Sequence, residues 1–521
     1  MPFVIVIWFL LSSCEERETV PVLPVSKNNT RVTEVNFYGP TQTITLRNLY
    51  KNNIFLVKVN TSAYIVEDNQ TGGAYPPTHL ANKLPKLDAA EELRIIGHPA
   101  ATRYHATPSF IQDNSYLLRG PSPLASSNSV GDKYDFWVET VFNNGNFIQR
   151  EATLQAIGEY CKIWVIPNSD YSKTITRTQA ETLVQKFDIV YSVETNLLGY
   201  EFGGGPSGSG GVDGDPKIHI LVYDIGKDYG GYFWAKDYKT QSQLNAEGKG
   251  WKTNNAEIFY IGAELMNKDP DFIYSSLIHE FQHMVNYNVK NIKNNITPED
   301  WYNEMLSLMA EDVMSSLIGI STSSSGHIQQ RIPLFLAGYF SIGITEWSEY
   351  DNTLSYSHKY AYGAYLLRNY GGAVILKEIM SNNLADEASI TTALNKAYGS
   401  GINFQYTLKR FGEALLYTRP LPSGAMTFDK TVTNTINRIT YISYGFNIWK
   451  IKNPSPSAVD NMHYYFDGYG PFIISHEYWA DMPSYSIALF SHESWLNITG
   501  DVLIILERPG NSNIKFLLMV L

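Results

Sequence analysis

The chain has 521 residues, of which 44% are hydrophobic and 17% charged, a balance typical of a folded globular protein. This length exceeds what one compact core can hold, so roughly two to four domains are expected. The formal net charge of −11 leaves no basic patch to neutralise phosphates, which argues against nucleic acid as a partner.

The N-terminal residues have the features of an export signal, although no Lys or Arg precedes Cys14. The apolar run over 3–11 is too short to span a bilayer, and the Leu-Ser-Ser-Cys that ends it resembles the bacterial lipobox. We expect 1–13 to be a lipoprotein signal peptide, Cys14 to carry the lipid, palmitate included, and 14–33 to be a tether. The protein would then be exported and anchored in the outer or inner membrane of the bacterial cell envelope. An apolar N-terminal strand is the alternative.

Two flanking segments have the pattern of β-rich modules. From 34 to 149, and again over 421–521, short runs of β-branched and aromatic residues alternate with turns rich in Asn, Gly and Pro. We expect a β-sandwich-like module on each side of a central domain over 150–420. The 36 tyrosines and 10 tryptophans are typical of β-rich extracellular surfaces.

The central domain combines strands with helices, which predicts an α+β fold. Apolar runs predict strands at 161–166, 217–223 and 256–261, and a capping box at 178–181 starts a helix between the first two. Helical periodicity dominates afterwards. The expected helices cover 298–318, 359–370, 372–382, 387–398 and 404–417.

A glycine-rich loop over 203–214 precedes the second of these strands. It lacks a Gly-Lys-Ser/Thr sequence and leads into a strand, so we exclude a phosphate-binding loop. Asp213 and Asp215 are interpreted as turn-forming carboxylates. Their oxygens could instead bind Ca²⁺, which is the alternative.

Residues 279–283 form an H-E-x-x-H motif within an apolar segment. On a helix, His279 and His283 lie one turn apart on the same face and can reach one Zn²⁺. Glu280 beside them can hold and deprotonate a zinc-bound water. The motif predicts two ligands and the general base of a zinc hydrolase. An ordinary helix with two histidines is the alternative.

A further carboxylate stands out on the helix that follows. Thr297 is a suitable N-cap and Pro298 suits the first turn. Glu304 shares a face of this helix with Trp301 and Leu308. A carboxylate on an apolar face is costly without a partner, and a metal is the best partner available. A solvated or salt-bridged glutamate is the alternative.

The H-E-x-x-H motif followed by N-E-x-x-S at 303–307 resembles the thermolysin-like gluzincins. This resemblance implies that Glu304 is the third zinc ligand. Gluzincins often place an Asp four residues later to orient the first histidine, and this chain has Leu308 there. Glu311 or Asp312 could take over that role.

Over roughly 150–420 the likeness extends to the hyicolysin family of bacterial metallopeptidases. The segments that carry it are His279–Met284, Trp301–Glu304, Ala310–Asp312, Phe187–Asp188, Val212–Pro216 and Ile258–Tyr260. The resemblance implies a zincin-type fold, a twisted mixed sheet plus helices, in a secreted or envelope neutral zinc protease. Another zincin class, H-E-x-x-H-x-x-G-x-x-H, is excluded, because Asn286 and Val289 occupy its last Gly and His positions.

In zincins the strand before the active helix is the exposed edge of the sheet. A substrate peptide adds to it through main-chain hydrogen bonds. By resemblance, we expect Glu257, Phe259 and Ile261 in the strand at 256–261 to bind substrate.

Gluzincins stabilise the oxyanion with a Tyr or His downstream of the ligands. The segment 355–365 is dense with such residues. Tyr360, Tyr362 and His358 are the candidates, in that order. Aromatic helix packing is the alternative for each of them.

The sequence therefore predicts an envelope-anchored zinc metalloendopeptidase that hydrolyses peptide bonds through a zinc-bound water activated by Glu280. Its partners are peptides or proteins, and an aminopeptidase stays possible. A second function class is a binding or adhesin-like lipoprotein that keeps the peptidase fold without activity. An intact Glu280 favours the enzyme, because degenerate enzymes usually lose the general base.

Overall fold

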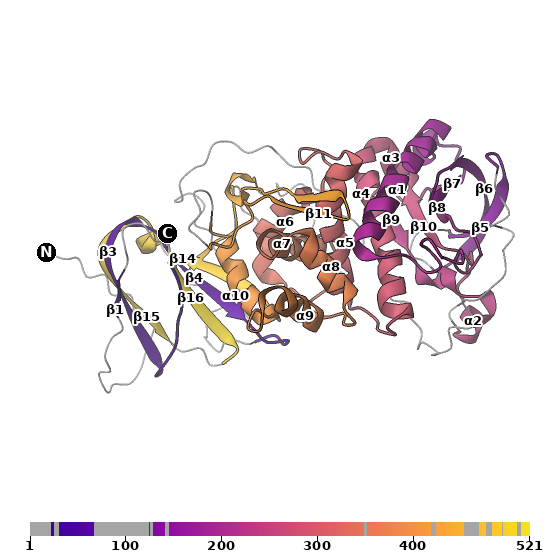
Figure 1. Cartoon of the computed structure of the whole chain (residues 1–521). Coiled ribbons are helices and arrows are strands. Elements are labelled where there is room, and N and C mark those ends of the chain that lie inside the picture. Colours follow the sequence, from indigo (N-terminus) through magenta and orange to yellow (C-terminus); the bar gives the residue numbers. More distant parts are fainter. Residues whose placement is uncertain are drawn as a thin grey trace.

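The computed structural model describes most of the chain, including all of 250–347, and Figure 1 shows its parts in a row. A mixed sheet lies at one end, helices form the middle, and two sheets lie at the other end. The described residues are 22–24, 31–66, 124, 129–140, 145–248, 250–347, 352–417, 424–452, 468–475, 482–491, 493–507 and 512–521. The expected signal peptide and Cys14 lie outside them.

A six-stranded mixed sheet begins the central domain, in the order β5-β6-β7-β8-β10-β9. Its strands are β5 (Lys133–Glu139), β6 (Phe147–Ile157), β7 (Cys161–Val165), β8 (Ile218–Tyr223), β9 (Gly231–Phe233) and β10 (Ile258–Gly262). The parallel strands β7, β8 and β10 are fully buried, as continuous apolar runs predict for strands covered on both faces. The domain boundary expected at 149 falls inside β6. Strands β5 and β6 both belong to this sheet, because β5 pairs with β6 and β6 pairs with β7.

The sheet has β5 at one edge and β9 at the other, and β9 pairs antiparallel with β10. The expectation that the strand at 256–261 forms the sheet edge is therefore wrong, because β10 lies between β8 and β9. A three-residue strand leaves no alternation in the sequence from which to predict it.

Two helices in contact with each other belong to this half of the domain, α1 (Arg177–Leu198) and α4 (Pro270–Asn286). Helix α1 starts with a capping box formed by Thr176 and Gln179, slightly before the expected one. Helix α4 continues into a π-helical segment, η6 (Tyr287–Ile292). Shorter helical segments are η4 (Tyr171–Lys173), η5 (Ala235–Tyr238), α2 (Gln241–Ala246) and α3 (Ala263–Lys268).

Helices make up the middle of the molecule. They are α5 (Asp300–Met314), η7 (Ser315–Ile318), η8 (Ile328–Arg331), α6 (Ile332–Gly338), η9 (Tyr339–Ser341), α7 (Asn352–Asn369), α8 (Ala373–Ser381), α9 (Glu387–Tyr398) and α10 (Phe404–Ala414). The helices α5, α7, α8, α9 and α10 match the five expected from periodicity, although α7 begins about two turns before the expected start at 359. Helix α6 was not expected. A hairpin of β11 (Val432–Ile436) and β12 (Ile439–Ser443) packs on α5 and α8.

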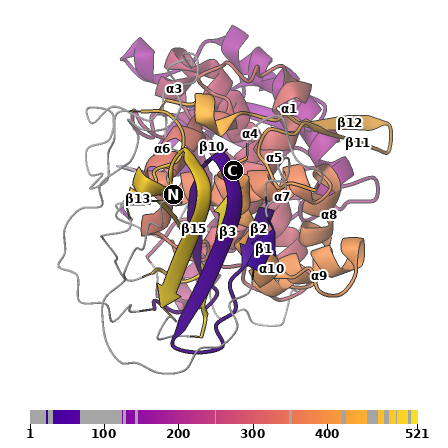
Figure 2. The same ribbon diagram turned by 90° about the vertical axis from the view of Figure 1, so that its left-hand side faces the viewer.

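The two ends of the chain form common sheets (Figure 2). One has the order β1-β3-β15 and the other β13-β14-β4-β16-β2. The strands are β1 (Val22–Pro24), β2 (Arg31–Glu34), β3 (Thr41–Asn52), β4 (Ile54–Asn60), β13 (Ile474–Ser475), β14 (Ile487–Ser491), β15 (Ile498–Glu507) and β16 (Ile514–Val520). Short 3-10 turns, η10 (Ile448–Lys450) and η12 (Glu493–Trp495), complete the elements.

Two separate flanking β-sandwich modules are therefore not confirmed. Strand β3 pairs with β15, and β4 lies between β14 and β16, so strands from both expected modules alternate in the same sheets. The physical reason is that an unpaired strand edge can be satisfied by a strand from any part of the chain, and local alternation does not specify which one. We call the two mixed sheets together the terminal β-module.

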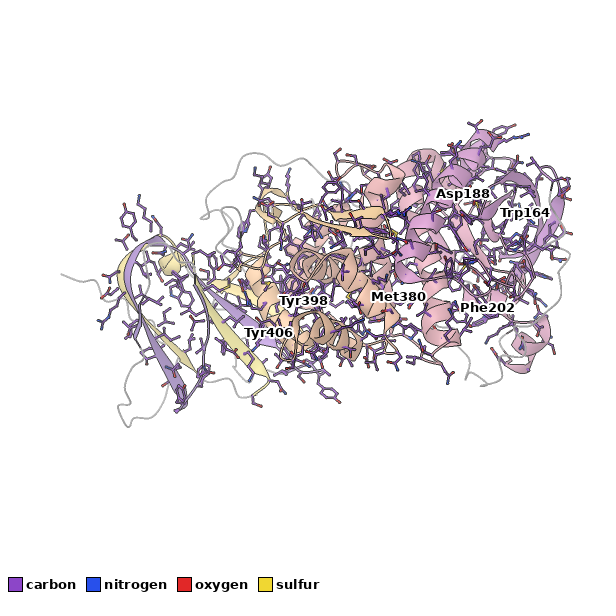
Figure 3. All side chains as sticks on the ribbon, viewed as in Figure 1. Trp164, Asp188, Phe202, Met380, Tyr398 and Tyr406 are labelled. Atoms are coloured by element: carbon purple, nitrogen blue, oxygen red, sulfur yellow. The ribbon has the colours of Figure 1, made fainter. Side chains whose placement is uncertain are left out.

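One hydrophobic core runs through the described residues from Val57 in the terminal β-module to Leu277 in α4. A second core lies on the other face of the six-stranded sheet and includes Trp164. Figure 3 shows Trp164 at the sheet end of the molecule and Met380 among the helices. Among the described residues, no helix has both the length and the apolar content needed to cross a membrane.

Candidate metal centre

Helix α4 places the H-E-x-x-H residues in the interior of the domain. Its N-terminus is fixed by Asp269, whose side chain accepts from the backbone N–H of Phe272, and by Pro270 in the first turn. The rings of His279 and His283 lie 4.7 Å apart at nearly right angles, on one side of the helix.

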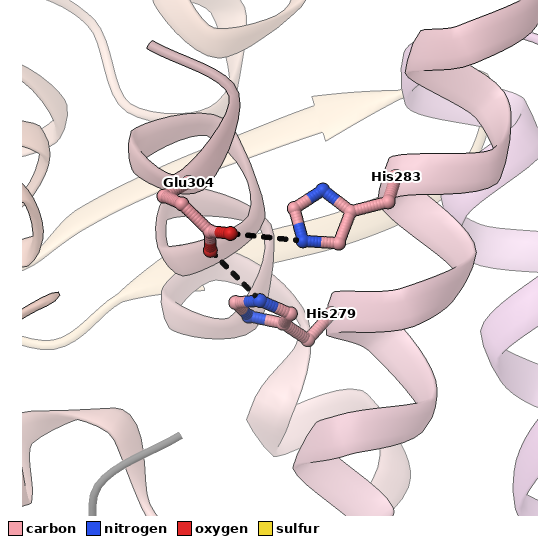
Figure 4. Close-up of side chains that lie close together, drawn as sticks. All are labelled: His279, His283 and Glu304. Atoms are coloured by element: carbon pink, nitrogen blue, oxygen red, sulfur yellow. Dashed lines mark ion pairs between the residues drawn. The ribbon is translucent and has the colours of Figure 1, made fainter. Parts of the chain in front are cut away.

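Glu304 of α5 faces both imidazoles (Figure 4). One carboxylate oxygen lies 3.1 Å from Nε2 of His279, and the other lies 3.5 Å from Nε2 of His283. These three side chains are buried, and one ligand atom from each lies within 4.8 Å of the others. Among the described residues, this is the one cluster of three or more His, Cys, Asp or Glu side chains close enough together to hold a metal ion.

The other nitrogen of each ring is held by a neighbouring side chain. Nδ1 of His279 lies 2.8 Å from Oε1 of Glu311, whose second oxygen accepts from Ser275 at 2.5 Å. Nδ1 of His283 lies 3.1 Å from the hydroxyl of Ser307. Both rings thus present Nε2 to the site, as metal-binding histidines do. Glu311 is one of the two residues expected to replace the absent Asp.

The electrostatics of these residues fit a cation between them. Burial alone would lower the pKa of His279, but hydrogen bonds to Glu304 and Glu311 raise it to about 10. Although burial acts to raise it, the two imidazoles bring the pKa of Glu304 below its ordinary value. Two imidazoles and a carboxylate are the ligand set of a catalytic zinc site, so the residues fit this metal.

Glu280 lies beside this ligand set with a free carboxylate oxygen. Its Oε2 atom is buried and has no hydrogen-bond partner. Burial, with a smaller contribution from Glu304, raises the pKa of Glu280 to about 7 against the opposing effect of the histidines. A carboxylate with a pKa near neutrality is suited to accept and return a proton.

Comparison with known proteins agrees with this geometry. The model of the peptidase M30 family matches residues 150–434, more than half of the chain. The chain belongs to the peptidase M30 family. The neutral metalloprotease ShpI of Staphylococcus hyicus is 28% identical over 314 residues, which are 55% of this chain and 62% of that relative. This chain therefore spans less than two thirds of that relative's length. The expected membership of the hyicolysin family is confirmed, and the M30 domain is a metallopeptidase domain.

The M30 domain does not bring the three expected oxyanion-stabilising residues to the ligands. The hydroxyl of Tyr360 donates to Asp312 at 2.6 Å, and Tyr362 bonds to Thr407 at 2.7 Å. Nε2 of His358 lies 3.0 Å from the carbonyl of Tyr339. Each side chain is buried in helix packing, which was the alternative for all three.

A different tyrosine of α7, Tyr356, lies beside the ligand group, one helical turn before Tyr360. Its ring lies 6.1 Å from the His279 ring. Burial and the charges of Glu304 and Glu280 raise its pKa well above the ordinary value, against Arg331. The sequence signal existed, since Tyr356 belongs to the same tyrosine-rich segment, but α7 starts earlier than the periodicity indicated.

The expected substrate-binding strand is enclosed by other elements. Glu257 is 2% exposed, and its carboxylate accepts from the N–H of Val212 at 2.9 and 3.0 Å. Phe259 packs on Phe187 with ring centroids 5.6 Å apart, and Ile261 is fully buried. These three residues therefore do not line a sheet edge.

Strand β9 occupies the edge of the sheet that was expected for the strand at 256–261. The backbone N–H of Phe233 donates to the Glu280 carboxylate. A Cβ added at Gly231 would lie 3.1 Å from Cγ of Glu280. The outermost strand of the M30 domain thus runs beside its general-base candidate.

The alternative of a calcium site in the glycine-rich loop is not supported. Asp213 lies 3.1 Å from Nε2 of His219, and Asp215 forms an ion pair of 2.5 Å with Lys162. Side chains of the sheet therefore engage both carboxylates, Asp213 through the His219 ring and Asp215 through the Lys162 ammonium, and these contacts fasten the loop to the sheet.

Proposed function

We propose that the chain is a zinc-dependent endopeptidase. The observation that carries this proposal is the convergence of His279, His283 and Glu304 with Glu280 beside them, all from two helices of an M30 domain. The metalloprotease relative supports the same reaction class.

Each side chain has a role in peptide hydrolysis. His279, His283 and Glu304 would hold the zinc ion, which supplies a Lewis acid and lowers the pKa of water. Glu280 takes a proton from the water whose oxygen forms the new bond to the scissile carbonyl carbon. It then delivers that proton to the amine nitrogen as the carbon–nitrogen bond breaks.

Substrate placement follows from the neighbours of Glu280. A peptide chain adds to the outer edge of β9 through main-chain hydrogen bonds, which explains how many sequences can be accommodated. The phenol of Tyr356 keeps its proton, since its pKa lies well above the ordinary value. It can therefore donate to the carbonyl oxygen as negative charge develops there.

The proposal includes the place of action. Export and lipid anchoring at Cys14 in the bacterial envelope rest on the lipobox-like sequence alone. They are checked by labelling cells with a palmitate analogue and comparing the chain with a Cys14→Ala variant.

The central test compares the full chain with Glu280→Gln on a mixed peptide library. Cleavage should require zinc and stop with a chelator, and Glu280→Gln should lose about 10²–10⁴-fold in rate because the proton acceptor is gone. Glu201→Gln is the control, since burial also raises the pKa of Glu201 to about 7 but this residue lies outside the motif. Metal content is measured by mass spectrometry for all three.

The outcomes separate the two function classes. Cleavage by the native chain and by Glu201→Gln, with one zinc per chain in Glu280→Gln, supports the peptidase. If none of them cleaves while all hold zinc, the chain is a binding protein with a peptidase fold. Equal activity of Glu280→Gln would remove Glu280 from the mechanism.

A further inference from the structure

Arg331, at the end of η8, is a buried cation for which no ion pair is found among the described residues. The residue is 4% exposed, and its Nη2 atom is buried with no hydrogen-bond partner. Among the described residues, no carboxylate or carbonyl oxygen is found bound to its guanidinium. Its side chain instead covers the ring of Tyr356, with Cζ 4.8 Å from the ring centroid.

A second arginine of the same helical region shows what a structural role requires. Arg368 is also buried, and its guanidinium donates to both oxygens of Asp312, at 3.3 and 2.9 Å, and to the carbonyl of Tyr444 at 2.6 Å. Burying a charge is costly unless it is paired and hydrogen-bonded. Arg368 has an ion pair with Asp312 and lacks a hydrogen-bond partner only at Nε, whereas no ion pair of Arg331 is found among the described residues.

The location of Arg331 places this unmet charge at the metal centre. The Tyr356 ring that it covers also lies near His279, with ring centroids 6.1 Å apart. Glu311 and Glu304 act on the guanidinium through space, but neither bonds to it. Glu304 faces the two imidazoles, and Glu311 bonds to His279 and Ser275.

A second unused donor lies next to the same tyrosine. The Trp347 ring is 5.0 Å from the Tyr356 ring and nearly perpendicular to it. Its Nε1 atom is buried and has no hydrogen-bond partner. Two buried donors, the Arg331 guanidinium and Trp347 Nε1, thus lie beside Tyr356 with unused donor capacity among the described residues.

We propose that Arg331 binds a carboxylate group of the substrate next to the scissile bond. This inference rests on the proposed peptidase function and names its substrate class. A guanidinium fork matches a carboxylate with two parallel hydrogen bonds, and such charge-assisted bonds are the strong ones. The carboxylate belongs either to an Asp or Glu side chain flanking the cleaved bond or to a free C-terminus.

The test uses the full chain and quenched fluorescent peptides in matched pairs. One pair differs only by Glu or Gln on each side of the cleaved bond, and the other only by a free or an amidated C-terminus. Native protein should favour the carboxylate member of one pair by at least about tenfold in kcat/KM, through KM. Arg331→Met should bring that ratio close to one, and Arg331→Lys should restore part of it.

A ratio measured within one enzyme does not depend on how much of a variant is folded. Arg368→Met serves as the matched control, since removing that buried arginine should lower stability but keep the ratio. A preference within the Glu/Gln pair identifies a side-chain carboxylate. A preference within the free/amidated pair identifies the C-terminal carboxylate.

The inference is overturned by a ratio near one in both pairs for the native protein. It is also overturned if Arg331→Met slows all peptides equally, which would make Arg331 a counter-charge for Glu304 and Glu311. If the native chain cleaves nothing, the proposed function fails instead. Thermal stabilisation of zinc-loaded Glu280→Gln by the acid and amide peptides then still decides the carboxylate question.

Discussion

At the scale of single residues, His279 shows how the site prepares for a metal. Glu304 and Glu311 contact opposite nitrogens of its ring, which favours the protonated imidazolium, with one N–H toward each carboxylate, while no metal is bound. A zinc ion must displace one of these protons, since only a neutral imidazole is a ligand. The side chains that raise the pKa of His279 to about 10 are thus the ones that orient it for the metal.

This coupling predicts a pH dependence of zinc affinity. A folded-state pKa raised from 6.5 to about 10 stabilises the metal-free protein fully below pH 6.5, and this stability is lost as the pH rises toward 10. Zinc affinity should therefore increase by about tenfold per pH unit between about pH 7 and 9, as one proton is released. Competition with a chromogenic chelator measures it.

A Glu311→Gln variant provides the comparison for this experiment. Without that carboxylate the His279 proton is held less tightly, so the dependence on pH should flatten. Affinity itself should fall by about 10–100-fold, as is usual when an orienting partner of a ligand is removed. A native affinity that does not change with pH would show that His279 is already neutral in the metal-free protein.

At the scale of elements, α7 decides which tyrosine faces the ligands. Tyr356 and Tyr360 are one turn apart on this helix, so periodicity alone places them on one face. The helix packs along α5, and its position makes Tyr360 meet Asp312 while Tyr356 meets His279. The packing of two helices separates two residues that the sequence presents as equivalent.

Substituting each tyrosine by phenylalanine separates their roles. Tyr356→Phe should lower kcat by about 10²-fold with little change in KM, because a donor to the developing charge is lost. Tyr360→Phe should keep kcat and lower thermal stability, because Asp312 loses a buried hydrogen bond. Steady-state kinetics and thermal unfolding on both variants check this, and the reversed pattern would return the role to Tyr360.

At the scale of the whole molecule, the chain closes on itself. The terminal β-module needs strands from both ends, and it packs on the helical region through contacts such as Lys409 with Glu34 and Tyr339 with Phe472. Gly412 of α10 approaches Val57 so closely that an added Cβ would lie 2.4 Å from its Cγ1 atom. The M30 domain therefore borders a module that the family match leaves largely outside.

Removing residues 482–521 should destabilise the protein as a whole. Strand β4 is buried along its length and would lose both neighbours, β14 and β16. We expect the truncated chain to aggregate, or to melt more than about 10 °C below the full chain. Apolar surface of β4 would become exposed, and its burial contributes several kcal/mol to the free energy of unfolding. Removing residues 1–14 is the control. Unchanged melting after the C-terminal truncation would show that the module folds without those strands.

Local chemistry in the sequence determined much of this protein. The H-E-x-x-H face and five of the helices follow from spacing and periodicity, because helix geometry fixes which neighbours share a face. Glu304 was singled out by its apolar helix face, and its role as third ligand came from the resemblance to the gluzincins. Glu311 was one of two expected partners for His279, and bonding in the fold selected it. The same local patterns predicted strands in both flanks, but they did not predict which strands pair with each other.

Only the tertiary structure decided which elements meet. That β9 is the edge, that Tyr356 faces the ligands and that the flanks share sheets are relations between segments far apart in the chain. Strand pairing and helix docking depend on the burial of surfaces across such distances, and local periodicity carries no information about them. The charge of Arg331, unpaired among the described residues, is also a feature that only the tertiary structure shows. The sequence does not tell whether a buried arginine has an ion-pair partner.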